Sequence, residues 1–193
     1  MYKLPTEVVV DSNLYHIRND GDYRVVLDCF SALNDLEVED ATERILIALY
    51  IFYDVDEVED ILRCADVAKL VSEMYNFFSG GTPEVESHNN YKTIDWESDS
   101  PLIFSAVNNV AGKEVRAEEY IHWWTFLGYY MAIGESTLAT VVSIREKILK
   151  GKELDKWERQ YRIDNPKYFV WESRTVDEIE AEKLVLDMWN NKE

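Results

Sequence analysis

Residues 120–134 read YIHWWTFLGYYMAIG, with six aromatic carbocycles among fifteen positions. If residues 117–134 form one helix, most of its large apolar side chains fall on one broad face at i, i+3, i+4 and i+7 spacing. A helix this apolar is either central to a core or shared between a core and a partner surface. The pattern favours the core. It leaves open that some of the Trp and Tyr side chains anchor a protein interface.

The same stretch is too short for a membrane span. A spanning helix needs about 20 predominantly apolar residues. Here the apolar run contains His122 and Thr125, and Glu118 and Glu119 precede it. The start of the chain, MYKLPTEVVV, also lacks a basic region followed by a long apolar one. We therefore expect no membrane segment and no signal peptide, and a protein that acts inside a cell.

The charge of the chain is strongly negative and uneven. The formal net charge is -18 over 193 residues. Residues 1–100 hold 22 acidic and 7 basic residues, and residues 101–193 hold 16 and 13. This balance argues against nonspecific nucleic-acid binding, which requires a basic surface. It is typical of a solvated acidic surface, and it leaves open a basic partner or mimicry of the charge of DNA.

Local patterns predict a mainly helical fold with a small N-terminal β-hairpin. Two short runs rich in β-branched and aromatic residues, 7–10 and 14–18, are joined by a turn-forming trio. Apolar side chains then recur at helical spacing along most of the remaining chain. We expect helices that begin near Asp22, Asp40 and Asp56, the third broken near residues 64–66, and further helices over residues 102–111, 117–134, 136–150 and 152–163.

The length of the chain predicts one main domain with an appendage. A chain of this size buries roughly 70% of its unfolded surface, so it needs no disulfide or metal for stability. We expect a helical domain with the hairpin over residues 1–165 and a C-terminal extension over residues 166–193. In the extension, Thr175 and Glu178 have the spacing of a capping box, which predicts one extra helix. Cys29 and Cys64 lack CxxC spacing and are expected to be reduced.

No motif in the sequence indicates an enzyme. The three histidines, His16, His88 and His122, are far apart, and the common zinc-protease, serine-hydrolase and nucleotide-binding motifs are absent. The acidic run at residues 95–99 lacks the spacing of a calcium-binding loop. Short acidic side chains favour caps and turns, which is the role we expect for this run. We expect no catalytic residue, no metal site and no cofactor.

Two phrases in the middle of the chain resemble a known family. The phrase D-W-E-x-D-x-x-x-I-F-S occupies residues 95–105, I-H-W-W-x-F follows at residues 121–126, and Arg145 stands in a later helix. The N-terminal half fits as well, with a proline, V-V-V, a turn, and D-Y-R at residues 22–24 opening a helix. Over roughly residues 4–163 the chain resembles the phage gene-product-fifteen family, small proteins of tailed phages of Gram-positive bacteria. It departs from the pattern at Ser12-Asn13, where a glycine is expected.

The resemblance implies a role in building phage tails. Genes of the family typically lie just before the tape-measure gene, and their products are taken to be tail-assembly chaperones. Such a protein would coat the long hydrophobic tape-measure helix in the cytoplasm of the bacterial host until the tail tube polymerises. The resemblance implies a mostly helical protein whose partners are the tape-measure protein and further copies of itself. It implies no catalytic residues. From the charge and the length of the apolar run, we expect neither nucleic acid nor a membrane as a partner.

The candidate partner-binding residues come from the aromatic phrases and from the basic helix that follows them. They are Trp96, Tyr120, Trp123, Trp124, Tyr130 and Arg145. Aromatic side chains anchor interfaces, and a basic residue could pair with the acidic N-terminal half, within one subunit or between two. Two other functions stay open. The protein could be a structural component retained in the finished tail, or an acidic mimic of DNA that occupies a basic partner.

Overall fold

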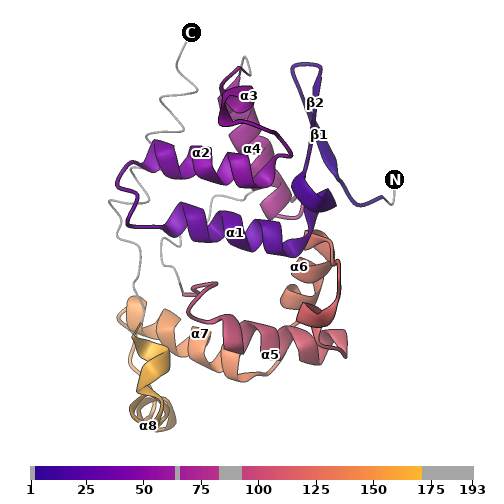
Figure 1. Ribbon diagram of the computed structural model, residues 1–193. Helices are drawn as coiled ribbons and strands as arrows, with labels where there is room; N and C mark the ends of the chain where they lie inside the picture. The colour runs from indigo at the N-terminus through magenta and orange to yellow at the C-terminus, as the bar shows by residue number, and fades with distance from the viewer. Residues whose placement is uncertain (1–2, 64–65, 83–92, 171–193) are drawn as a thin grey trace. The chain divides into compact units, whose positions relative to one another are not determined.

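The computed structural model describes residues 3–63, 66–82 and 93–170 (Figure 1). The predicted fold class is confirmed, because these residues are mainly helical and include an N-terminal antiparallel hairpin. The helix expected from Thr175 onward lies outside the described residues. The described chain falls into two compact units. Unit 1 contains residues 3–63, 66–82 and 119–127, and unit 2 contains residues 93–118 and 128–170.

Unit 1 begins with the hairpin. Strand β1 (Glu7–Val10) pairs with β2 (Asn13–His16), so that Val9 lies opposite Leu14. The two turn residues, Asp11 and Ser12, have φ angles of 50° and 68°. A two-residue hairpin turn needs left-handed backbone at these positions, and aspartate tolerates it better than most residues. The turn therefore forms without the glycine that the family pattern led us to expect.

Two helices of unit 1, α1 (Tyr23–Asn34) and α2 (Ala41–Phe52), lie side by side (Figure 1). Their starts are set by Asp22 and Asp40, whose carboxylates each accept a hydrogen bond from the backbone N–H two residues later. These side chains satisfy N–H groups that have no partner inside the helix. The sequence signals for both helix starts are thus confirmed.

The third predicted helix is divided where the sequence indicated a break. Helix α3 (Val58–Leu62) ends before residue 64, and α4 (Val67–Phe78) begins after Asp66, which caps it. The core of unit 1 is aromatic. Phe52 of α2 packs edge-on against both Phe77 and Phe78 at the end of α4, with ring centroids 5.2 and 5.6 Å apart. T-shaped pairs of this kind stabilise beyond the area that they bury.

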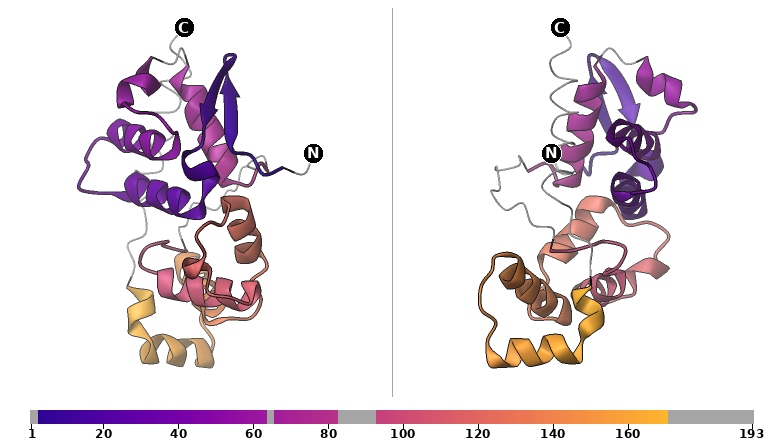
Figure 2. Two further views of the ribbon diagram at one scale, coloured as in Figure 1. Left: turned by 45° about the vertical axis from the view of Figure 1, so that its right-hand side comes forward. Right: turned by 90° about the vertical axis from the view of Figure 1, so that its left-hand side faces the viewer.

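Unit 2 is built around α5 (Ser100–Ala111) and α7 (Thr137–Leu149), which pack together. A short turn η2 (Val115–Ala117) follows α5, and α8 (Lys156–Asp164) and η3 (Pro166–Phe169) follow α7 (Figure 2). Helix α5 begins at Ser100, earlier than the predicted start at residue 102. Asp99, rather than Ser100, is the N-cap residue, and its carboxylate makes no capping bond because it serves another partner described below.

The aromatic stretch forms a shorter helix than predicted. Instead of residues 117–134, helix α6 covers only Trp123–Met131. The backbone before it is extended, because the Tyr23 N–H donates to the Ile121 carbonyl (2.9 Å) and the Ile121 N–H donates to the Asp22 carboxylate (3.0 Å). These two bonds occupy backbone groups that a longer helix would need. The division between the two units falls within α6, after Leu127.

In the part of the chain that the structure describes, no helix combines the length and the apolar character that crossing a bilayer requires.

Candidate functional site

The two tryptophans of the aromatic phrase close the end of α4 in unit 1. Trp123 donates its indole N–H to the Phe78 carbonyl, and Trp124 donates its own to the Phe77 carbonyl, both at 2.9 Å. The last carbonyls of a helix have no partner within it. The tryptophan pair therefore acts as a side-chain cap for α4. Trp123 is almost fully buried, and Trp124 is half-buried.

His122, which precedes the two tryptophans, is a buried hydrogen-bonding residue. Its Nδ1 accepts the backbone N–H of Trp124 at 3.0 Å, so the proton of the neutral ring is on Nε2. Nε2 then donates to the Pro5 carbonyl at 2.9 Å. Burial lowers the pKa of His122, against smaller raising effects of the Pro5 bond and of the Asp22 charge. The imidazole therefore ties the N-terminal segment to the aromatic phrase in its neutral form.

Asp22 connects the start of α1 to the same phrase. One carboxylate oxygen accepts the N–H of Arg24, and the other accepts the N–H of Ile121. The Arg24 guanidinium forms an ion pair with this carboxylate at 3.1 Å. Next to it, Tyr120 is 47% exposed and donates its hydroxyl proton to the Asp20 carbonyl at 3.0 Å. Tyr120 thus presents its ring on the surface of unit 1.

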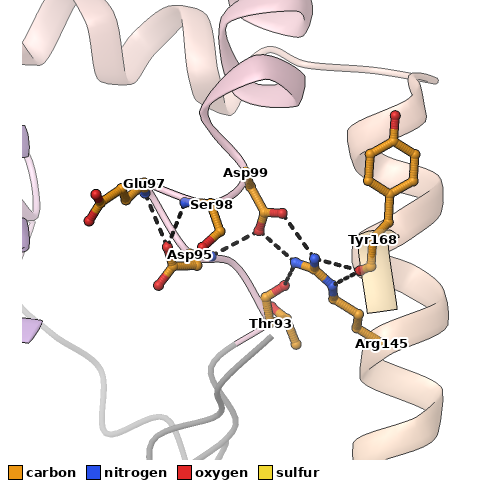
Figure 3. A network of polar contacts seen from close by, with 7 residues as sticks. All are labelled: Thr93, Asp95, Glu97, Ser98, Asp99, Arg145 and Tyr168. Carbon is orange, nitrogen blue, oxygen red and sulfur yellow. Dashed lines mark hydrogen bonds and ion pairs between the residues drawn. The ribbon is translucent and has the colours of Figure 1, made fainter. Parts of the chain in front are cut away.

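In unit 2, the acidic phrase and Arg145 form one buried network (Figure 3). The Arg145 guanidinium donates to both oxygens of Asp99, at 2.5 and 2.9 Å. It also donates to the Thr93 carbonyl at 3.1 Å and to the Tyr168 carbonyl at 2.6 and 2.8 Å. A planar guanidinium suits such a two-pronged carboxylate contact. The network joins the start of α5, the middle of α7 and η3.

Asp95 holds the turn that presents Asp99. Its carboxylate accepts the N–H groups of Glu97 and Ser98, and its own N–H donates to Asp99 at 2.9 Å (Figure 3). Asp95 is thus used in a turn, as expected for the acidic run, whereas Asp99 is used in an ion pair that the sequence did not predict. In the described residues, no three or more His, Cys, Asp or Glu side chains are grouped so that they could hold a metal ion.

An accessible aromatic pair lies in unit 2. The rings of Trp96 and Tyr130 are 5.0 Å apart at 44°, and both side chains are half-buried. Burial raises the pKa of the Tyr130 hydroxyl, and the negative charge of Asp99 adds to this effect. The next residue, Met131, is 76% exposed at the end of α6. Methionine is flexible and polarizable, which suits contact with an apolar partner.

The six candidate residues therefore occupy three kinds of position. Trp123 and Arg145 are buried and hydrogen-bonded within their own units, Trp96, Trp124 and Tyr130 are half-buried, and Tyr120 is exposed. The structure brings Trp96 next to Tyr130, and both Trp123 and Trp124 to the end of α4. Met131 was not among the candidates. The sequence offered one indication of it, because Met131 directly follows the aromatic run.

The two units differ in charge. The described residues of unit 1 include 18 acidic and 6 basic side chains, whereas those of unit 2 include 11 and 10. The negative charge of the described chain is therefore concentrated in unit 1, and any long-range attraction by that unit favours a basic partner.

Comparison with protein families gives one match. A family described as Bacteriophage Gp15 protein matches residues 2–168, which include both aromatic phrases, Asp99 and Arg145. No curated protein and no solved structure matches the chain.

Proposed function

Because the chain belongs to the Bacteriophage Gp15 protein family, we propose that it is a tail-assembly chaperone. In this proposal it binds the tape-measure protein and self-associates during tail morphogenesis, in the cytoplasm of the bacterial host. It performs no catalysis and uses no cofactor. The observation that carries the proposal is the family match over residues 2–168.

The accessible aromatic pair supports the tape-measure part of the proposal. A chaperone for a long apolar helix needs surface positions where aromatic and flexible apolar side chains can receive it. Trp96 and Tyr130 are half-buried, and Met131 is exposed beyond them. Trp and Tyr are the residues that most often anchor interfaces. We therefore assign Trp96, Tyr130 and Met131 as the tape-measure docking residues.

The charge of unit 1 supports the same role. With 18 acidic and 6 basic side chains in its described residues, unit 1 repels other acidic surfaces in solution. A complex with an aggregation-prone helix would remain dispersed for the same reason. The charge thus supplies the solubility that a chaperone of this kind needs.

Co-expression with fragments of the tape-measure protein tests the proposal. We expect the chain to keep such fragments soluble and to co-purify with them. The double variant Trp96→Ala/Tyr130→Ala should lose most of this effect, while Tyr120→Ala, which removes an exposed ring from unit 1, should retain it. Circular dichroism of each variant checks the fold. A wild-type chain that leaves every fragment insoluble would contradict the chaperone function.

Two other functions are separated by simple measurements. If the protein is a structural component of the tail, mass spectrometry of purified virions finds it at stoichiometric levels, whereas a chaperone is scarce there. The second alternative is an acidic mimic of DNA that occupies a basic partner, and the negative charge of unit 1 is the observation that favours it. A mimic competes with DNA for a basic partner, and a chaperone does not.

A further inference from the structure

Helix α8 exposes large apolar side chains in unit 2. Trp157 is 59% exposed and Ile163 is 69% exposed, and both lie on a helix of nine residues. The Trp157 ring contacts only one other ring in the described chain, that of Tyr161 on the next turn, at 5.2 Å. An isolated exposed apolar residue needs no explanation, but α8 exposes two large ones, about 120° apart around the helix, so that they flank its outward side.

The opposite side of α8 is fixed to its own unit. Glu158 is buried and accepts a hydrogen bond from the Lys147 ammonium of α7, which lowers the pKa of Glu158. Tyr161 meets Phe169 of η3 edge-on at 6.4 Å. Both views of Figure 2 place α8 at an end of unit 2. The helix is therefore held along one side and presents the other outward.

The outward side is basic. Lys156, Arg159 and Ile163 share a stripe of the helix at i, i+3 and i+7, and Arg162 lies beside Arg159 at i+3. We call the exposed residues of this region the α8 surface: Lys156, Trp157, Arg159, Arg162, Ile163 and Lys167. Asp164 is an exposed carboxylate of the same helix, and it accepts a hydrogen bond from Gln160. The α8 surface thus carries positive charge in a chain whose net charge is -18.

Unit 1 presents a surface of the opposite charge around α3. Tyr50 and Leu62 are exposed there, and the Tyr50 hydroxyl donates to the Asp56 carbonyl at 3.4 Å. We call the exposed carboxylates of residues 54–59, together with these two apolar side chains, the α3 surface: Tyr50, Asp54, Asp56, Glu57, Glu59 and Leu62. Two arginines adjoin it, Arg18 paired with Asp54 and the exposed Arg63 paired with Asp60, and the carboxylates outnumber them. Apolar groups are thus accompanied by acidic groups on the α3 surface and by basic groups on the α8 surface. The two surfaces are complementary in charge and similar in apolar content.

We propose that the α8 surface of one copy docks on the α3 surface of a second copy. This inference rests on the self-association in the proposed function and names the surfaces that carry it. A polyanion such as DNA or an anionic membrane suits the α8 surface locally, but the net charge of -18 repels both. An acidic protein surface with apolar groups attracts the α8 cations at short range and also offers contacts to the apolar side chains beside them.

The contact joins two different surfaces, so it is heterologous unless the same two copies make it twice about a two-fold axis. After one heterologous contact forms, one copy keeps a free α3 surface and the other keeps a free α8 surface. Heterologous contacts generate rings when the rotation between copies closes, and open helical arrays when it does not. The inference therefore predicts assembly that grows with concentration and weakens with salt, because salt screens exposed charges.

Charge exchange between the two surfaces tests the inference. Arg159→Glu/Arg162→Glu reverses the α8 surface, and Asp56→Lys/Glu59→Lys reverses the α3 surface. Analytical ultracentrifugation should show that each variant alone associates at least about tenfold more weakly than wild type, because like charges then face each other. An equimolar mixture should associate again, because each reversed surface meets its complement. Lys113→Glu/Arg116→Glu is the control, with the same charge change elsewhere in unit 2.

The outcomes separate this inference from the proposed function. If both double variants associate like wild type, the α8–α3 contact is wrong, while self-association stands. If wild type is monomeric at every concentration, the contact is wrong, and binding of tape-measure fragments is still measured independently. If the α8 variant keeps its oligomers but no longer keeps tape-measure fragments soluble, the α8 surface binds the tape measure instead. Only the recovery of association in the equimolar mixture supports the contact.

Discussion

Asp99 and Arg145 are 46 residues apart in the sequence, and their side chains form a two-pronged ion pair that is almost completely buried. The same guanidinium binds the carbonyls of Thr93 and Tyr168. One arginine thereby connects three segments of unit 2. Removing one partner of a buried ion pair leaves the other charge uncompensated, which costs far more than the pair contributes as a whole.

Replacing Arg145 by Met should destabilise unit 2 strongly. We expect a loss of about 3–5 kcal/mol in the free energy of unfolding, since Asp99 would be left as a buried, unpaired charge. The double variant Asp99→Asn/Arg145→Met should recover part of this loss, because the unpaired charge is gone. Urea titration followed by circular dichroism measures both. Arg159→Met, at an exposed arginine, is the matched control and should change little. Equal effects of the two arginine substitutions would contradict the structural role of Arg145.

The same residues show that most positions of the family phrases are structural. Asp99 and Arg145 stabilise unit 2, and His122 and Trp123 stabilise unit 1, in all four cases by hydrogen bonds of buried side chains. Among the phrase residues, Trp96 is half-buried and stays accessible to a partner, and further large apolar side chains are exposed on α3, α6 and α8.

The two neighbouring tryptophans should differ in their contribution to stability. Trp123→Phe leaves the buried Phe78 carbonyl without its donor and creates a small void, so we expect a loss of about 2–4 kcal/mol. Trp124→Phe removes an equivalent bond from a half-buried position, where water can replace the donor, so we expect about 1 kcal/mol. Chemical denaturation of both variants measures the difference. A larger loss for Trp124→Phe would mean that the burial of the two rings is misassigned.

Gly21 should tolerate no side chain. Its φ angle is +79°, and a Cβ there would lie 2.7 Å from the Phe77 ring and 3.1 Å from His122 Nε2. We expect Gly21→Ala to cost about 2–4 kcal/mol, from left-handed strain and from overpacking together. Gly112→Ala is the matched control. Its φ angle is +68° but a Cβ would meet nothing within 4 Å, so only strain of about 1–2 kcal/mol remains. Thermal unfolding of both variants compares the two effects.

Local sequence signals predicted much of the fold because they depend on neighbours in the chain. The helix starts at Asp22, Asp40 and Ser136 and the helix end at residue 111 were predicted correctly, since each depends on a backbone pattern within a few residues. The start of α6 was wrong because Ile121 bonds to Asp22 and Tyr23, about 100 residues earlier. Apolar periodicity contains no information about such a distant partner.

The candidate site could be predicted only by residue type, for a related reason. Aromatic composition identified Trp96, Trp123 and Tyr130 alike, but their exposure depends on which segments fold over them. Trp123 is covered by α4, and Trp96 remains accessible beside Tyr130. The partner of Arg145 was equally hidden, because many carboxylates in so acidic a chain were available and Asp99 was read as part of a turn. Tertiary packing decided between positions that the sequence could not distinguish.

The stability of unit 1 should fall in mild acid through His122. Its imidazole accepts the Trp124 N–H through Nδ1. Protonation of Nδ1 would make it a donor, so that two N–H groups would face each other and the hydrogen bond would be lost. The folded state holds the pKa of His122 below its ordinary value, against the raising effect of Asp22. The unfolded chain, with a pKa of about 6.5, therefore takes up the proton first as the pH falls. The stabilising effect is complete above about pH 6.5 and is progressively lost below it.

His122→Gln separates this effect from that of the many carboxylates. We expect the wild-type chain to lose more unfolding free energy between about pH 8 and about pH 5.5 than the Gln variant, because only the wild type carries the buried imidazole. The carboxylates are common to both chains and cancel in the difference. His16→Gln removes an exposed imidazole of the hairpin and should keep the acid-induced loss. Identical pH profiles for wild type and His122→Gln would show that the buried ring does not govern the response, and that the Pro5–His122–Trp124 connection is not the acid-sensitive part of unit 1.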